Sequence, residues 1–163
     1  LLVLLYCLPL PGFKWNFRGF KGLKIHLVAL SWVLTTVFLP LSIHGQVMAE
    51  FSLVYAFQRY IFVLVATLPF EIRDMKLDDP NLSTWPQKLG IQKTRLLGGL
   101  LLFFFVSLEI YHSISSNFFL VLGMAILLMA FVLKSNEEQS KYFCSFWVEG
   151  IPILWLILKY ITM

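Results

Sequence analysis

Four of the nine acidic residues of this chain lie within nine consecutive positions. Glu71, Asp74 and Asp78 are spaced so that they share one face of a helix, provided that the preceding helix continues through them. Arg73 and Lys76 would then lie on roughly the opposite side. Three carboxylates on one face suit a hard divalent cation, and suit it better when a phosphate supplies further oxygen ligands. The spacing therefore indicates a site for a cation and a phosphate.

The position of these carboxylates in their helix supports the same interpretation. Pro80 is expected to stop the helix, which places the acids at its C-terminal end. That end is the negative pole of the helix dipole, so clustered acids are unfavourable there unless a cation compensates them. Arg73 or Lys76 could supply part of that compensation, and a solvated interfacial loop is the alternative. A metal is indicated by the pattern and not required by it.

Long apolar segments must position this cluster. The chain is 59% hydrophobic and 13% charged, against about 25% charged residues in soluble domains. Full segments of about 18–22 residues, enough to cross a bilayer, show no two-residue alternation typical of strands. We predict an all-α, polytopic transmembrane helical bundle that forms a single domain over residues 1–163. It would have about five full spans, at 25–43, 49–70, 95–112, 117–134 and 146–163, and one partial span ending near residue 10.

The start of the chain is expected to be the cut end of a span. Residues 1–8 are too few to cross a bilayer, which takes about 20 residues. They follow no initiating Met and lack the basic leading region and the cleavage site of a signal peptide. We therefore expect the chain to be the C-terminal part of a longer protein.

Basic residues predict the orientation. The loops at 11–24, 71–95 and 134–145 hold eleven of the thirteen Lys and Arg residues, and the alternate loops near 44–50 and 112–117 hold none. Under the positive-inside rule, the three basic loops are cytoplasmic and the C-terminus lies outside. Because the basic residues are confined to loops between apolar segments, the net charge of +4 does not indicate nucleic-acid binding.

The first basic loop has two interpretations. Its residues could orient the protein and attract anionic lipid, at about 1 kcal/mol for each basic residue. Alternatively, one or two of them could grip a diphosphate that is held by the metal. The candidates are Lys14, Arg18, Lys21 and Lys24.

The polar residues within the apolar segments have no motif of their own, and we interpret each by its position in its segment. His26 could be a buried hydrogen-bonding residue or a base in a cavity, and the first is favoured. Glu109 is expected to lie at the outer interface. Arg59 lies in the outer half of its span, where a functional position and snorkelling to the interface are both open. Glu149, early in the last segment, is expected near the cytoplasmic side.

The motif residues resemble those of the UbiA superfamily of intramembrane prenyltransferases. The second Asp-rich motif of that family reads Asp/Asn-x-x-Asp-x-x-x-Asp, and Glu71, Asp74 and Asp78 match it with Glu in the first place. The run Ile-Arg-Asp at 72–74 and the run Thr-Trp-Pro-Gln-Lys-Leu-Gly at 84–90 are similar to those of the menaquinone-type branch. Tyr-Cys-Leu-Pro at 6–9, followed by a basic loop, resembles the Tyr-Ser-x-Pro and the basic stretch that the family has two spans before its second Asp-rich motif. The first Asp-rich motif of the family would precede residue 1.

The resemblance implies a specific chemistry. Mg²⁺ would be bound by Glu71, Asp74 and Asp78, with Asp74 and Asp78 as the catalytic residues. The partners would be a polyprenyl diphosphate, a lipophilic acceptor such as an aromatic ring, and membrane lipid. Diphosphate contacts would come from Arg73, Lys76 and the basic-loop residues Lys14, Arg18 and Lys21. The resemblance also implies a bacterial inner membrane as the location and a nine-helix bundle as the complete fold.

Two other functions remain open. A non-catalytic membrane protein could keep this bundle and bind an isoprenoid lipid or a protein partner. A transporter half would need paired charges or broken helices near the middle of the bilayer, and the sequence shows little of that kind.

Overall fold

The computed structural model describes residues 22–43, 50–78, 83–112, 118–140 and 142–161, and these residues contain helices and no strand. The all-helical prediction is confirmed for them. In chain order the elements are α2 (Leu23–Val33), the π-helical η2 (Leu34–Phe38), α3 (Leu39–Ile43), α4 (Glu50–Asp74), α5 (Trp85–Leu89), α6 (Ile91–His112), α7 (Phe118–Lys134), the π-helical η4 (Phe143–Val148) and α8 (Ile151–Ile161).

Four segments of the described residues are long and apolar enough to cross a membrane: Leu23–Ile43, Leu53–Asp74, Ile91–Tyr111 and Phe143–Ile161. The remaining predicted full span is α7, whose 17 residues extend about 25 Å at 1.5 Å per residue. A bilayer core is about 30 Å thick. The predicted partial span near residue 10 lies outside the described residues. The chain is therefore a helical membrane protein, and its described part holds four candidate spans and one shorter apolar helix.

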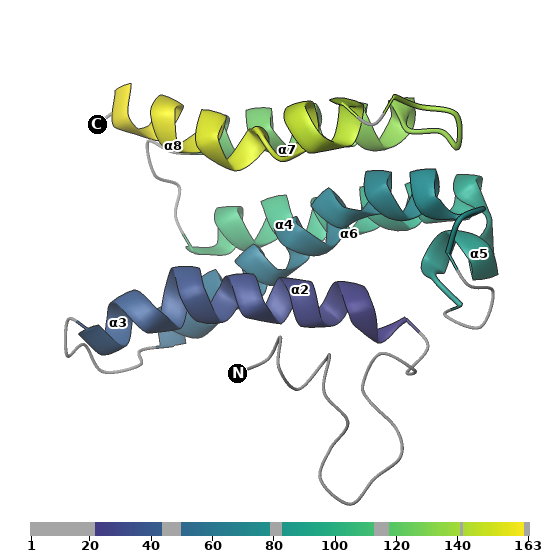
Figure 1. Cartoon of the computed structure of the whole chain (residues 1–163). Helices are drawn as coiled ribbons and strands as arrows, with labels where there is room; N and C mark the ends of the chain where they lie inside the picture. The colour runs from purple at the N-terminus through teal and green to yellow at the C-terminus, as the bar shows by residue number, and fades with distance from the viewer. Residues whose placement is uncertain (1–21, 44–49, 79–82, 113–117, 141, 162–163) are drawn as a thin grey trace, which may run out of the picture.

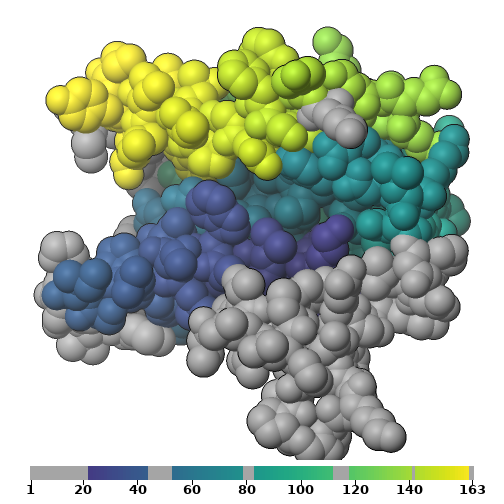
Figure 2. All heavy atoms as spheres, viewed as in Figure 1, coloured from purple at the N-terminus to yellow at the C-terminus, as the bar shows by residue number. Residues whose placement is uncertain are grey.

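The helices lie in three layers (Figure 1). Helices α4 and α6 lie between α2 and α3 on one side and α7 and α8 on the other. The space-filling view shows the same two outer layers on either side of the middle one (Figure 2). Half of the apolar stretch of α4 is buried, against 17% of that of Leu23–Ile43. Helix α4 is thus the central helix, and the acidic motif lies at its C-terminal end.

The core forms where α4, α6, α7 and α8 meet. Phe62 and Phe105 are fully buried with ring centroids 5.8 Å apart, and the Trp155 ring lies 5.1 Å and 6.0 Å from them. Leu68 of α4 and Leu128 of α7 are fully buried beside them. Tilted and edge-on aromatic contacts of this kind are favourable beyond their buried area. They fix the inner faces of the helices.

Gly98 allows close packing of α6 on its neighbours. A Cβ atom there would lie 3.0 Å from Leu68 of α4 and 3.5 Å from Val132 of α7. We expect Gly98→Leu to lower the free energy of unfolding by about 1–3 kcal/mol, because overpacking a filled contact forces the helices apart. Detergent-solubilised protein unfolded by heat or denaturant would measure the loss.

The control for this prediction is Gly123→Leu on α7, where a Cβ atom meets nothing within 4 Å. That variant should unfold like the wild type. Equal stability of the two leucine variants would contradict the packing that we describe at Gly98.

Two polar groups of α4 make contacts that the sequence did not predict. Gln58 donates hydrogen bonds to Glu109 Oε2 at 3.0 Å and to the carbonyl of Phe105 at 3.3 Å. Glu109 is 8% exposed and lies three residues before the end of α6, so it is buried among the helices near that end, and the expected position at the outer interface stays a prediction. The Arg59 guanidinium lies 5.1 Å from the centroid of the Trp155 ring. Arg59 therefore reaches an aromatic face of α8, a favourable contact for a cation.

Candidate functional site

The acidic motif begins inside α4 and ends outside it. The helix stops at Asp74, and a turn over residues 75–77 follows. The amides of Leu77 and Asp78 both donate to the Asp74 carbonyl, at 2.9 and 2.8 Å. The helix does not run on toward Pro80, but the Asp78 amide keeps the four-residue hydrogen-bond spacing of an α-helix. Asp78 and Glu71 meet the same Lys24 ammonium group, which agrees with their predicted place on one face.

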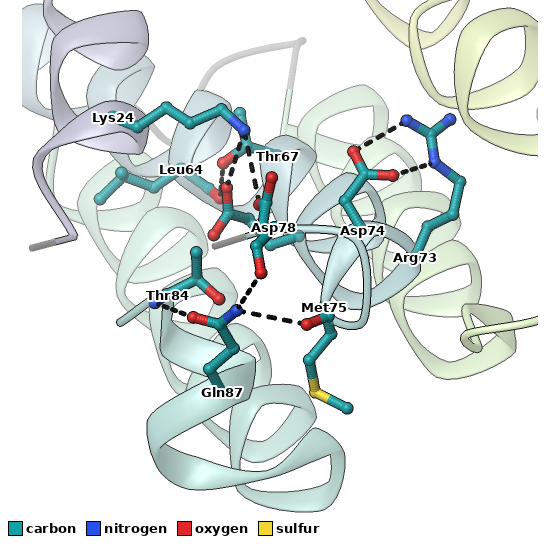
Figure 3. A network of polar contacts seen from close by, with 10 residues as sticks. Lys24, Leu64, Thr67, Arg73, Asp74, Met75, Asp78, Thr84 and Gln87 are labelled. Atoms are coloured by element: carbon teal, nitrogen blue, oxygen red, sulfur yellow. Dashed lines mark hydrogen bonds and ion pairs between the residues drawn. The ribbon is translucent and has the colours of Figure 1, made fainter. Parts of the chain in front are cut away.

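Lys24 joins these two carboxylates (Figure 3). Its Nζ atom lies 3.8 Å from Glu71 Oε1 and 3.7 Å from Asp78 Oδ2. The side chain of Glu71 is only 4% exposed and that of Asp78 20%, whereas that of Lys24 is 46% exposed. Lys24 belongs to the first turn of α2, which packs against α4. Two elements far apart in the sequence thus build one charged cluster.

Gly22 sets the direction in which α2 enters this cluster. Its φ angle is +72°, in the left-handed region that costs glycine little and other residues more. It immediately precedes α2. The sharp turn at Gly22 therefore places Lys24, two residues later, over the end of α4.

Asp74 has a different partner. Arg73 donates from Nε to Asp74 Oδ1 at 2.7 Å and from Nη2 to Oδ2 at 3.0 Å, a two-pronged pair typical of Arg and a carboxylate. Figure 3 shows the Asp74 carboxylate directed at Arg73 and not at Lys24. The guanidinium also lies 5.5 Å from the centroid of the Phe70 ring. The three predicted metal ligands therefore form two groups, one on Lys24 and one on Arg73.

Helix α5 holds the turn that presents Asp78. Gln87 donates from Nε2 to the carbonyls of Met75 and Asp78, both at 3.2 Å, and its Oε1 accepts from the Thr84 amide at 3.0 Å. Thr84 precedes the helix, and Gly90 follows it with a φ angle of +80° that favours glycine. Residues 84–90 therefore support the neighbouring turn, because their short helix positions Gln87 beneath it (Figure 3).

Gln87→Leu should loosen this turn. Each lost hydrogen bond contributes about 1 kcal/mol, which corresponds to roughly fivefold faster opening. We therefore expect the amides of Leu77 and Asp78 to exchange with deuterium at least about fivefold faster, while amides of the α4 core are unchanged. Hydrogen–deuterium exchange read by mass spectrometry measures both.

Gln92→Leu is the matched control, because Gln92 is exposed in the first turn of α6. It should leave the exchange at Leu77 and Asp78 as in the wild type. Unchanged exchange in Gln87→Leu would show that Gln87 does not hold the turn.

The two described basic loops meet at this end of the molecule. Lys76 pairs with Glu137, and this hydrogen bond and charge raise the pKa of Lys76. Arg95 Nη2 donates to the Ser135 carbonyl at 2.6 Å, and Gln139 donates to the Pro69 carbonyl at 2.8 Å. Loops 71–95 and 134–145 therefore share one end of the bundle, as the charge pattern predicts. Lys76 faces Glu137 and not the Glu71–Asp78 pair.

An aromatic group lies close to Lys24 along the same helices. His26 Nδ1 lies 2.6 Å from the Tyr60 hydroxyl, and the His26 ring meets Trp85 edge-on at 5.6 Å between centroids. All three side chains are half-buried. The prediction that His26 is a hydrogen-bonding residue is confirmed. The contacts join α2, α4 and α5 beside the charged cluster.

The carboxylate oxygens of the cluster show which ligands a metal ion would find here. Glu71 and Asp78 converge on one positive charge, and Asp78 Oδ2 is buried without a hydrogen-bond partner among the described residues. Such an oxygen suits a hard cation such as Mg²⁺. No group of three or more His, Cys, Asp or Glu side chains that could hold a metal occurs in the described ranges. The fit is thus to two carboxylates, Glu71 and Asp78, with Asp74 set apart.

The predicted diphosphate contacts Lys14, Arg18 and Lys21 lie outside the described residues. Lys24 was one of four basic-loop candidates, and its place directly before the apolar segment 25–43 was the signal that could have distinguished it. Gln87 was recognised as part of a similar run, with no partner assigned. No family model matches the chain, and neither curated proteins nor solved structures gave a match.

Proposed function

We propose that this chain forms one part of an intramembrane prenyltransferase site of the UbiA type, which acts with Mg²⁺. The observation that supports the proposal most is the convergence of Glu71 and Asp78 on one positive charge at the end of a membrane-spanning helix. A divalent cation bound to a phosphate needs oxygen ligands in such a place. The similarity of residues 71–78 and 84–90 to the family motifs supports it further.

The proposed reaction transfers a polyprenyl group. The allylic C–O bond of a polyprenyl diphosphate breaks, and pyrophosphate leaves with the bonding electrons. A bond forms between the allylic carbon and a carbon of the lipophilic acceptor, which then loses a proton. Mg²⁺, when bound at the carboxylates, would supply positive charge beside the leaving group. The protein must bind the anion, orient it and exclude water from the reacting carbon.

Different described residues would bind the cation and the diphosphate. Glu71 and Asp78 would hold the cation, with Asp78 positioned by Gln87. Arg73 and Lys24 would bind diphosphate oxygens, since both are cations at this end of the bundle. Asp74 would keep Arg73 in place through its two hydrogen bonds. Lys76 has Glu137 as a partner, so the case for it as a diphosphate ligand is weaker than for Arg73.

The apolar parts of the substrates would extend from this cluster into the membrane. Tyr60 and Trp85, held by His26, present half-buried aromatic surface beside the cluster. An isoprenoid tail or an aromatic acceptor packs well against such a surface. With the basic loops on the cytoplasmic side of a bacterial inner membrane, the diphosphate would arrive from the cytoplasm.

A second function is favoured by a specific observation. Each acid of the motif already has a basic partner within the chain, Lys24 for Glu71 and Asp78, and Arg73 for Asp74. A cluster neutralised in this way is also compatible with a membrane protein that binds an isoprenoid lipid without reacting with it.

Release of pyrophosphate separates the two functions. The intact protein in lipid nanodiscs would be incubated with polyprenyl diphosphates of several lengths, aromatic and other lipophilic acceptors, and MgCl2. The proposal expects pyrophosphate release that stops when EDTA is added. Saturable binding of the prenyl diphosphate without any release would instead support the lipid-binding function.

A further inference from the structure

Lys24 lies where a cation between Glu71 and Asp78 would have to lie. Its ammonium group is almost equally far from Glu71 Oε1 and Asp78 Oδ2, at 3.8 and 3.7 Å. It comes from α2, whereas both carboxylates belong to α4 and the turn that follows it. The first turn of α2 therefore brings a positive charge to a place that two acids from another element surround.

The contacts of Lys24 are long for hydrogen bonds. Charge-assisted N–H···O bonds are about 2.7–2.9 Å long, and the Lys24 contacts exceed this by almost 1 Å. Asp78 Oδ2 is buried and receives no hydrogen bond from the described residues. Lys24 thus compensates the charge of the two carboxylates and leaves an oxygen lone pair unsatisfied. A smaller ion that coordinates directly would satisfy that oxygen better.

The Lys24 side chain is also much more exposed to solvent than the carboxylates that it contacts. It is 46% exposed, whereas the side chain of Glu71 is 4% exposed. The four-carbon stem of lysine rotates easily and its ammonium group is well hydrated. An anion on the open side of the cluster would attract the same ammonium group. The carboxylates therefore stay in place while their counter-ion can move.

We infer that Lys24 is a tethered counter-ion that occupies the cation position of Glu71 and Asp78, so that a divalent cation binds there only when Lys24 moves out. An incoming diphosphate draws Lys24 onto its own oxygens and frees the two carboxylates. Binding of the anion and binding of the divalent cation are thereby coupled through this one side chain. The part assigned to the diphosphate rests on the proposed function, and the competition between Lys24 and the cation does not.

Mn²⁺ binding tests the inference directly. Bead-captured protein in nanodiscs would be equilibrated with Mn²⁺, and the retained metal would be measured for the wild type, Lys24→Gln and Lys24→Arg. Coupling between sites typically changes affinity by about 5–150-fold. We expect Lys24→Gln to bind Mn²⁺ at least about tenfold more tightly than the wild type, and Lys24→Arg to bind it as weakly as the wild type. Asp78→Asn added to Lys24→Gln should remove the gain.

Inorganic pyrophosphate provides the second arm. It should increase the Mn²⁺ retained by the wild type severalfold and that retained by Lys24→Gln much less, because no lysine has to be displaced in the variant. Retention by the wild type that does not respond to pyrophosphate would overturn the part assigned to the diphosphate. Equal Mn²⁺ affinity of Lys24→Gln and the wild type would overturn the competition itself.

Folding of the variant is part of the same test. If Lys24→Gln unfolds in EDTA, the inference expects MgCl2 to restore its melting temperature, since the ion replaces the missing charge. A variant that stays unfolded in MgCl2 contradicts the inference.

The results also separate this inference from the proposed function. If the wild type transfers prenyl groups and Lys24→Gln binds Mn²⁺ no more tightly than the wild type, this inference alone is wrong. If Lys24→Gln binds Mn²⁺ more tightly than the wild type but the wild type transfers no prenyl group, the proposed function alone is wrong.

Discussion

Glu71→Gln is expected to lower the rate of pyrophosphate release at least about 100-fold while the protein stays folded. The substitution keeps the shape of the side chain and removes the charge of a carboxylate that is only 4% exposed. Loss of one group that stabilises a developing charge typically costs about 100- to 1,000-fold in rate. Because Glu71 lies beside Asp78 through their shared partner Lys24, its charge acts at the proposed cation position.

Glu137→Gln is the matched control for this prediction. Glu137 lies at the same end of the bundle and pairs with Lys76. Among the described residues it makes no ion pair or hydrogen bond with Glu71 or Asp78. The same chemical change there should leave the rate within about twofold of the wild type, because Glu137 pairs with Lys76 and not with the cation position of Glu71 and Asp78. A Glu71→Gln protein as active as Glu137→Gln would remove Glu71 from the catalytic site.

Lys24→Met should lower the free energy of unfolding by about 2–3 kcal/mol when it is measured in EDTA. Breaking a buried ion pair by removing one partner costs about 3–5 kcal/mol, because the remaining charge is left uncompensated. The 46% exposure of Lys24 reduces that value. Glu71, by contrast, is 4% exposed and would keep its full desolvation cost. Reversible unfolding in detergent micelles, followed by circular dichroism, measures the loss.

The double variant shows whether the uncompensated charge is the cause. Lys24→Met combined with Glu71→Gln should regain part of the loss, because the more buried of the two carboxylates is then neutral, while Asp78, 20% exposed, keeps its charge. Lys93→Met, at an exposed lysine in the first turn of α6, should unfold like the wild type. If the double variant is less stable than Lys24→Met, the ion pair between Lys24 and Glu71 does not stabilise the fold as we describe.

The helices were largely predictable because apolar segments of bilayer length leave the backbone few alternatives. Helix α4 was expected to end its apolar part near residue 70 and was found to reach Asp74. The spacing predicted that Asp78 lies on the same face as Glu71, and both meet Lys24. The turn that carries Asp78 was not predictable, because it is held by Gln87, which comes nine residues later and from another helix.

The partners of the charged residues were the least predictable part of the site. Sequence spacing placed Glu71, Asp74 and Asp78 together, and the structure divides them between Lys24 and Arg73. Side chains choose partners by the packing of whole helices, and the spacing along one helix does not contain that information. The same holds for Glu109, which finds Gln58 on a neighbouring helix and is buried there.

The central claim is that Glu71, Asp78 and their cationic neighbours act on a prenyl diphosphate in the membrane. The most direct test is mass spectrometry of acceptors incubated with the intact protein, an isotopically labelled polyprenyl diphosphate and MgCl2 in lipid vesicles. The account predicts a product heavier than its acceptor by the labelled prenyl group less one hydrogen, formed by the wild type and not after EDTA. An unchanged acceptor and intact diphosphate across the whole panel, with folded wild-type protein, would contradict it.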